Sequence, residues 1–340
     1  MNDIIERDVR EMLGRVDVKK AKGKKVLITG ANGLIGQYVV AALSLANRDK
    51  RLRIRIDTAG KGAPRAVLKG LMRFDKKISY HRVDLAKPFT LGGYDYIFHA
   101  AGYAQPARFV SDPAGTMAVN VDASVRLLEG SPHATFVFFS SAEVYGDIPQ
   151  KLIPVKEDFN GNSPLHNPRS VYAESKRLGE ALCAAYAREK KRSVKIMRIS
   201  AVYGPGLPKD DARVMSDFIW KALRDKEIRL LDGGRAVRTY GYVADVVAMI
   251  LFAAFNGREM VYNVGGKDQI SILDLAKRIA KETSAKFSIP LAASRLSHIG
   301  KDPKVVRLDL SRIRKEMKRL SFTPFKQGLR RTILWSTSTR

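Results

Sequence analysis

The chain has 340 residues, of which 45% are hydrophobic and 28% charged, as expected for a folded protein with a full core. A single cysteine, Cys183, excludes an internal disulfide framework, and no apolar run is long enough to predict a transmembrane helix. The formal net charge of +27 is compatible with nucleic-acid binding or with attraction of small anionic substrates, and the even spread of lysines and arginines favours the second. We therefore expect a cytoplasmic protein, with no membrane or nucleic-acid partner.

The first predicted elements alternate between helix and strand. Residues 2–16 predict a helix packed on the main domain, with an apolar stripe formed by Ile5, Val9, Met12, Leu13 and Val16. Residues 24–36 indicate a strand, a tight glycine turn and the beginning of a helix that continues over 37–47. Further apolar strands are expected at 52–57, 78–85, 94–102, 135–141 and 193–200. Such strands, separated by helices, predict an α/β fold with a doubly wound parallel sheet of the Rossmann type.

A glycine motif lies between the first strand and its helix. The three glycines are Gly30, Gly33 and Gly36. They suit a tight turn, close approach of the backbone to a pyrophosphate, and close packing of helix on strand. Asp57 ends the next predicted strand at the distance expected for binding the ribose hydroxyls, which favours NAD over NADP, although it could be a plain turn residue. Lys61 and Arg65 follow closely and could soften that preference.

The pattern becomes irregular after about residue 203. Turns are expected at 203–208 and 232–234, and helices at 214–225 and 271–283. We predict a helical extension over residues 1–22, a dinucleotide-binding domain over 23–202 with residues 238–264 returning to it, and a smaller mixed α/β substrate domain over 203–340. The smaller domain is expected over the carboxyl edge of the sheet, where such folds bind ligands.

Tyr172 and Lys176 lie four residues apart on a predicted helix, so both face the same way. Tyrosine is a poor base at neutral pH because its pKa is near 10, and a neighbouring ammonium group favours the phenolate. Ser141 adds a hydroxyl at the end of a preceding strand. Together with the glycine turn, these residues predict acid–base chemistry beside a bound dinucleotide.

The chain resembles the extended short-chain dehydrogenase/reductase family, and within it the nucleotide-sugar epimerases, dehydratases and decarboxylases. The resemblance runs from about Lys24 to the C-terminus. It is carried by TGANGLIG, FHAAG, DPAGTMAVNV, SSAEVYGD, YAESKRLGE, YGPG, RTYGYVADVV, YNVGG and RLDLSRIRKEM, in that order. It implies a nucleotide-sugar substrate, a tightly bound NAD that is recycled in each turnover, and a homodimer joined through helices such as the alanine-rich EALCAAYA segment.

The resemblance also assigns roles to individual residues. Tyr172 would be the base, Lys176 its partner and a ligand of the nicotinamide ribose, and Ser141 the hydroxyl that shares the proton. The stretch His99–Gly102 would lie along the cofactor. The cofactor contacts would be Gly30, Gly33, Leu34, Ile35, Gly36, Asp57, Asp84, Leu85, Ala100, Ala101, Gly102, Asn120, Ser140 and Lys176. No metal site is expected, because the histidines lack metal-ligand spacing.

The stretch SSAE separates the possible reactions. In the 4,6-dehydratases of the family an acid precedes the glutamate, whereas here Ala142 precedes Glu143 and cannot donate a proton. UDP-glucuronate decarboxylases resemble this stretch better, because a 4-keto intermediate loses CO2 without a general acid. Glu143 would then position the sugar or assist proton return, and Arg238 would meet the diphosphate or the carboxylate. The other implied substrate contacts are Tyr103, Gln105, Val214 and Arg307.

Alternatives stay open at this point. Ala142, Ala201 and the loop GYAQPARF depart from the usual decarboxylase pattern. A 4-epimerase or an atypical dehydratase acting on another nucleotide sugar is the main alternative. A reductase that releases NAD(P)H in each cycle, or a non-catalytic protein that binds RNA or other polyanions on the same scaffold, represents a different class. Cys183 is expected to be a packed thiol.

Overall fold

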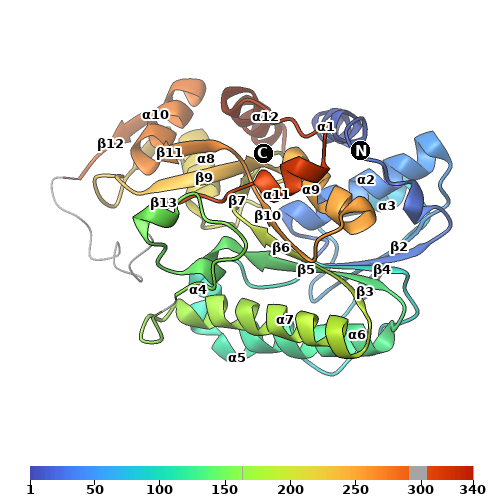
Figure 1. Ribbon diagram of the computed structural model, residues 1–340. Helices are drawn as coiled ribbons and strands as arrows, with labels where there is room; N and C mark the ends of the chain where they lie inside the picture. The colour runs from blue at the N-terminus through green and yellow to red at the C-terminus, as the bar shows by residue number, and fades with distance from the viewer. Residues whose placement is uncertain (163, 291–304, 340) are drawn as a thin grey trace.

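A seven-stranded parallel sheet forms the centre of the molecule, and the computed structural model describes residues 1–162, 164–290 and 305–339 (Figure 1). In sheet order, the strands are β10 (Val261–Val264), β6 (Ser193–Ile199), β5 (Thr135–Ser141), β4 (Tyr96–His99), β1 (Lys25–Thr29), β2 (Arg55–Gly60) and β3 (Ile78–Arg82). Each strand pairs in parallel with its neighbours. The interiors of the central strands are buried because helices cover both faces of the sheet.

Two helical layers cover the sheet, as Figure 1 shows. One layer contains α1 (Asp3–Leu13), α2 (Leu34–Lys50), α3 (Ala66–Phe74) and α9 (Val243–Asn256). The other contains α4 (Pro106–Ser111), α5 (Pro113–Met117), the π-helical turn η2 (Ala118–Asp122), α6 (Ala123–Gly130) and α7 (Ser170–Glu189). The predicted doubly wound parallel sheet is therefore confirmed. In the part of the chain that the structure describes, no helix is long and apolar enough to cross a bilayer.

Two small sheets lie beside the carboxyl edge of the large one. The first joins β11 (Asp268–Ser271), β9 (Val237–Tyr242), β13 (Val305–Val306) and β7 (Ala201–Tyr203), and the second joins β12 (Lys286–Ser288) and β8 (Glu227–Arg229). The accompanying helices are α8 (Val214–Asp225), α10 (Ile272–Thr283), α11 (Ser311–Glu316) and α12 (Phe325–Ser338). Three single-turn helices are η1 (Lys19–Ala21), η3 (Ala142–Tyr145) and η4 (Gln150–Leu152).

The chain crosses between these layers more than once. Within the predicted return segment 238–264, α9 packs on α2 and β10 joins the large sheet, whereas β9 belongs to a small sheet. The predicted substrate domain includes residues 291–304 and 340, which lie outside the described residues. The domain boundaries at residues 22 and 202 stay predictions.

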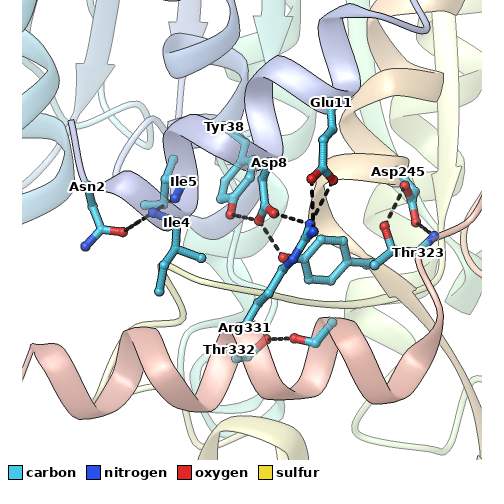
Figure 2. A network of polar contacts seen from close by, with 12 residues as sticks. Asn2, Ile4, Ile5, Asp8, Glu11, Tyr38, Asp245, Thr323, Arg331 and Thr332 are labelled. Carbon is cyan, nitrogen blue, oxygen red and sulfur yellow. Dashed lines mark hydrogen bonds and ion pairs between the residues drawn. The ribbon is translucent and has the colours of Figure 1, made fainter.

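The helix α1 is tied to the rest of the fold at its start and along its inner face. The side chain of Asn2 caps α1, because its Oδ1 accepts hydrogen bonds from the backbone N–H groups of Ile4 and Ile5 at 3.1 and 3.4 Å (Figure 2). The predicted apolar stripe from Ile5 to Val16 is buried against α2 and α9.

A buried carboxylate, Asp8, joins α1 to three other elements (Figure 2). Its Oδ1 accepts a hydrogen bond from Nη1 of Arg331 on α12 at 2.7 Å. Its Oδ2 accepts hydrogen bonds from the hydroxyls of Tyr38 on α2, at 3.0 Å, and Tyr242 on β9. Asp8 is completely buried. Every acceptor atom of this carboxylate thus has a donor, as a charge inside a protein requires.

Candidate active site

The glycine turn between β1 and α2 has the shape that a dinucleotide pyrophosphate requires. Gly30 adopts φ +69°, and a Cβ atom there would lie 2.7 Å from the backbone of Ala100 and Ala101. A Cβ atom at Gly36 would lie 2.5 Å from the carbonyl oxygen of Gly30. Both positions therefore exclude any side chain. The turn brings the N-terminus of α2 against the residues that follow β4.

A cavity of about 330 Å³ opens from this turn along the carboxyl edge of the sheet. Most of the residues predicted to form a site line it. These are Gly30, Gly33, Leu34, Ile35, Gly36, Ala100, Ala101, Gly102, Ser140, Ser141, Glu143, Tyr172, Lys176 and Arg238. The cavity thus places the predicted cofactor motif and the predicted acid–base group in one space, although they come from β1, β5 and α7.

Asp57 does not lie at a strand end, which is a correction to the sequence prediction. The strand β2 continues to Gly60, and Asp57 pairs with Leu27 in the middle of β1. Its carboxylate accepts a hydrogen bond from the Tyr94 hydroxyl at 3.1 Å and lies 3.6 Å from Nζ of Lys25. Asp57 is therefore held inside the sheet layer and does not line the cavity.

Four other predicted residues do not line the cavity, namely Asp84, Leu85, Tyr103 and Gln105. Asp84 follows β3, where its Oδ2 lies 3.1 Å from Nζ of Lys61, and Leu85 beside it is buried. Burial, followed by the charge of Asp112, raises the pKa of Tyr103 against the effect of Lys61, and Tyr103 is not among the residues that line the cavity. Gln105 donates a hydrogen bond to the carbonyl oxygen of Asp210 at 3.4 Å.

The remaining predicted substrate contacts also fall outside the cavity lining. Val214 begins α8, and 36% of its surface is exposed. Arg307 is exposed, and its carbonyl oxygen accepts a hydrogen bond from the backbone of Val155 at 2.9 Å. Neighbouring residues line the cavity in their place, namely Arg213 and Val306. Arg213 directly precedes Val214, and the substrate contact at Val214 stays a prediction.

The predicted acid–base residues converge at the end of β5. The hydroxyl of Ser141 acts on the Tyr172 phenol and lowers its pKa. The ammonium group of Lys176 donates a hydrogen bond to the carbonyl oxygen of Phe139 at 2.7 Å, and it lies 5.9 Å from the centre of the Tyr172 ring. The ring of Phe109, on α4, stacks on the Tyr172 ring with 4.8 Å between centroids and 14° between planes. Helix α7 and strand β5 thus hold the phenol and the hydroxyl together, and α4 fixes the face of the phenol.

The electrostatics differ from the sequence prediction in direction. Burial, followed by the negative charge of Glu143, raises the pKa of Tyr172 to about 12, against the lowering effects of Ser141 and of two arginines. Burial lowers the pKa of Lys176 to about 7. The expected lowering of the tyrosine pKa by its ammonium neighbour is therefore not found: the groups that lower this pKa are others, and removal of the phenol from water outweighs them. The groups that favour the phenolate are Ser141, Arg213 and Arg169.

Three guanidinium groups line the cavity, and sequence reasoning identified only Arg238. Arg169 lies one helical turn before Tyr172, and its Nη2 forms an ion pair with Oε1 of Glu143 at 3.0 Å. Arg213 precedes α8 and is held by Asp211, with 2.6 Å between Nη2 and Oδ2. The spacing of Arg169 to Tyr172, three residues on one helix, was a signal that could have found it. The cavity is accordingly suited to an anionic ligand.

Comparison with known proteins identifies the family. The sequence model of the NAD dependent epimerase/dehydratase family matches residues 26–265. The chain belongs to this family. The predicted membership of the extended short-chain dehydrogenase/reductases is thus confirmed, as is the prediction of an enzyme that uses NAD.

Individual relatives of this chain show where the similarity lies. UDP-glucuronic acid decarboxylase 1 of Xenopus tropicalis is 26% identical over 312 residues, which cover 91% of this chain and 71% of the relative. UDP-glucuronic acid decarboxylase 2 of Arabidopsis thaliana is 31% identical over 266 residues, which cover 78% of this chain but only 58% of the relative. The structure of UDP-glucuronic acid 4-epimerase from Bacillus cereus, with UDP-glucuronic acid and NAD, matches 93% of this chain and 100% of that chain, with a TM-score of 0.78 and 22% identity.

The residues of this family member fit NAD at the pyrophosphate and at the nicotinamide ribose. The glycine turn leaves space only for backbone beside the pyrophosphate. At the other end, a Cβ atom on Gly102 would lie 3.2 Å from Oδ1 of Asn120 and 3.4 Å from Nζ of Lys176. Among the described residues, this buried oxygen of Asn120 has no hydrogen-bond partner. Asn120 and Lys176 would hold the ribose of bound NAD, which would supply a hydride acceptor beside Tyr172.

Proposed function

We propose that the enzyme decarboxylates UDP-glucuronate, or a close nucleotide-sugar analogue, to a UDP-xylose-type product through a transient 4-keto sugar. The observation that carries the proposal is the composition of the cavity. Tyr172 and Ser141 share it with three guanidinium groups, while Ala142 stands beside Glu143 without a proton donor. These residues suit the removal of a hydroxyl proton from an anionic sugar. They provide no acid at position 142 that could protonate a departing hydroxide.

The reaction starts with oxidation at C4 of the sugar. NAD, when bound, would supply the hydride acceptor and donor, so that the cycle would be redox-neutral. Tyr172 takes the proton of the C4 hydroxyl, assisted by Ser141, which lowers the pKa of the phenol. A nearby positive charge is needed because the Tyr172 pKa is raised to about 12 by burial and by Glu143. Arg213 and Arg169 supply that charge in the protein itself.

Carbon dioxide then leaves from the 4-keto sugar. The bond between C5 and C6 breaks, and its electron pair passes into the C4 ketone, which becomes an enolate. C5 next takes up a proton, and Tyr172 returns its own proton to the C4 oxygen as the hydride comes back. No general acid is required at the position of Ala142, since the leaving group is CO2 rather than hydroxide.

The guanidinium groups are proposed to bind the charges of the substrate. A nucleotide sugar of this class carries a diphosphate and a sugar carboxylate, and the planar fork of arginine fits either group. Arg213 is the candidate for the carboxylate, because its charge acts on Tyr172 directly and Asp211 holds its fork in place. Arg238 is the candidate for the diphosphate. The net charge of +27 would further attract such an anion.

Glu143 is proposed to orient the sugar or to assist proton return at C5. It lines the cavity, and its ion pair with Arg169 holds the carboxylate, with 3.0 Å between Nη2 and Oε1.

The main alternative function is 4-epimerisation, which needs the same oxidation but no loss of CO2. It is favoured by the structural likeness to a 4-epimerase. Dehydration is disfavoured because Ala142 cannot donate a proton to a departing hydroxide. A protein that only binds polyanions would not need a cavity lined by Tyr172, Ser141 and the glycine turn.

The test is a product analysis with matched variants. The protein is incubated with UDP-glucuronate, UDP-N-acetylglucosamine and dTDP-glucose, and the products are analysed by mass spectrometry. We expect loss of CO2 from UDP-glucuronate, no loss of water from any substrate, and no accumulation of reduced nicotinamide absorbance. Tyr172→Phe should abolish turnover, whereas Tyr186→Phe, the same change on the exposed end of α7, should not. Unchanged mass with inverted C4 by NMR would replace this proposal with epimerisation.

We also propose that the enzyme is a homodimer joined through α7. Leu178 on this helix is 47% exposed, and Ala181 and Ala185 lie on the same face of the helix. Cys183 is buried in the same helix, and burial raises the pKa of its thiol, as expected for a packed rather than a reactive cysteine. Light scattering after size exclusion should give twice the chain mass and should give the monomer mass for Leu178→Arg. A monomeric wild-type chain would contradict the proposal.

A further inference from the structure

The end of β2 carries a glycine where a ribose-binding carboxylate would have to stand. Ala59 pairs with Thr29 at the end of β1, and the N–H of Gly30 donates a hydrogen bond to the carbonyl oxygen of Ala59 at 3.0 Å. The next residue, Gly60, is therefore level with the glycine turn. Dinucleotide-binding folds that select NAD place an acidic side chain at this level, where it binds the ribose hydroxyls and repels a 2′-phosphate.

A side chain at position 60 would crowd a tyrosine of the neighbouring strand. A Cβ atom on Gly60 would lie 3.0 Å from the hydroxyl of Tyr80, which comes from the neighbouring strand β3. That hydroxyl donates hydrogen bonds to the carbonyl oxygens of Gly60, at 3.2 Å, and Gly62. Tyr80 thus fills the space of the missing carboxylate. Asp57, three residues earlier, is held by Tyr94 inside the sheet layer and cannot replace it.

Two cationic side chains lie immediately beyond this strand end. Lys61 follows Gly60, and 71% of its side chain is exposed. Arg82 ends β3, and its Nε donates a hydrogen bond to the carbonyl oxygen of Lys61 at 3.4 Å. The loop is anchored to the glycine turn, because Asn32 donates to the carbonyl oxygen of Ala63 at 3.0 Å. The backbone that carries Lys61 is therefore held beside the glycine turn, at the adenosine end of the cofactor site, while the side chain of Lys61 reaches into solvent.

We propose that this site accepts the 2′-phosphate of NADP, with Lys61 and Arg82 as its partners, so that the enzyme binds NADP as well as NAD. The current partner of Lys61 does not prevent this. Asp84 lies 3.1 Å from Nζ of Lys61, and an exposed ion pair of this kind is weak in water. Lys61 can therefore turn to a phosphate, which offers it two negative charges instead of one. The inference rests on the cofactor site of the family and not on the proposed sugar reaction.

A binding competition tests the proposal without any sugar substrate. The purified protein is incubated with equal concentrations of NAD and NADP until the bound ratio no longer changes, and the bound dinucleotides are released with acid and separated by chromatography. We expect NADP to make up about a third or more of the bound cofactor. A smaller share would overturn the proposal. If the proposed sugar reaction is not observed, the result of this binding competition still stands. If NADP does not bind, the proposed sugar reaction with NAD is likewise unaffected.

Variants locate the phosphate partners. Lys61→Ala combined with Arg82→Ala should lower the bound NADP:NAD ratio by about tenfold or more, since both charge-assisted contacts are lost. The control, Lys318→Ala combined with Lys326→Ala, removes two exposed lysines of the C-terminal segment and should leave the ratio unchanged. Equal ratios in the two double variants would overturn the assignment.

The reverse substitution is the second arm of the test. Gly60→Asp combined with Tyr80→Phe removes the obstructing hydroxyl and introduces the missing carboxylate. This variant should release NADP and retain NAD, provided that its melting temperature shows it to be folded. A folded variant that keeps the wild-type ratio would also count against the proposal.

Discussion

Replacing Arg331 with methionine should destabilise the protein far more than the same change at Arg330, its neighbour on α12. Arg331 is 7% exposed and lies 2.7 Å from the completely buried carboxylate of Asp8. Without the guanidinium, that carboxylate keeps only two phenol donors inside the fold. Removing one partner of a buried ion pair costs about 3–5 kcal/mol of the free energy of unfolding. This is a large part of the ~5–15 kcal/mol available to a typical domain.

The control variant is Arg330→Met, because Arg330 forms an ion pair that is exposed to solvent. Arg330 is 57% exposed in its ion pair with Glu282 at 2.8 Å, and such surface pairs contribute about 0–1 kcal/mol. Urea unfolding followed by circular dichroism compares Arg331→Met with Arg330→Met. The double variant Asp8→Leu with Arg331→Met should recover part of the loss, because no charge is left buried. Equal losses in the two single variants would refute the argument that Asp8 fastens the terminal helices.

Three further predictions concern the site. Lys176→Met should raise the free energy of unfolding most at and below about pH 7, because burial lowers the native pKa of Lys176 from its usual 10.5 to about 7 and the buried ammonium is costly while both states are protonated. Urea titrations should show the variant's advantage shrinking as pH rises from about 7 to 10.5, where only the unfolded state binds the proton, and a constant difference over this range would contradict the prediction. Phe109→Leu should lower kcat more than it changes KM, because the ring that orients Tyr172 is lost, and equal effects on both constants would point to substrate binding instead. Asp57→Asn should leave the bound ratio of NAD to NADP unchanged in chromatography, since its carboxylate lies away from the ribose, and a shift towards NADP would restore the sequence prediction.

The sequence predicted the elements that periodicity and glycine chemistry determine. The strand at 135–141 and the helix at 214–225 have the predicted bounds, because apolar runs and turn residues mark both ends. Gly30 and Gly36 were identifiable because only glycine allows the backbone to approach so closely there. These features depend on local sequence alone, so no knowledge of the partner strands was required.

Features that depend on register or burial were less accessible. The end of β2 is defined by its pairing with β1, so the sequence could not show that the strand continues past Asp57 through two buried residues. The pKa of Tyr172 depends on burial by α4 and on the charge of Glu143, neither of which its spacing to Lys176 reveals. The sequence likewise does not reveal that Arg213 lines the cavity, because this depends on where the first turn of α8 lies in the fold.

The central claim is that Tyr172 removes a proton from a sugar hydroxyl while the hydride at the same carbon is taken up and later returned. Turnover of UDP-glucuronate labelled with deuterium at C4 tests this claim most directly. We predict a decarboxylated product that retains the deuterium at C4 and takes up one hydrogen from solvent at C5. Loss of the C4 label, or turnover that survives in Tyr172→Phe, would contradict it.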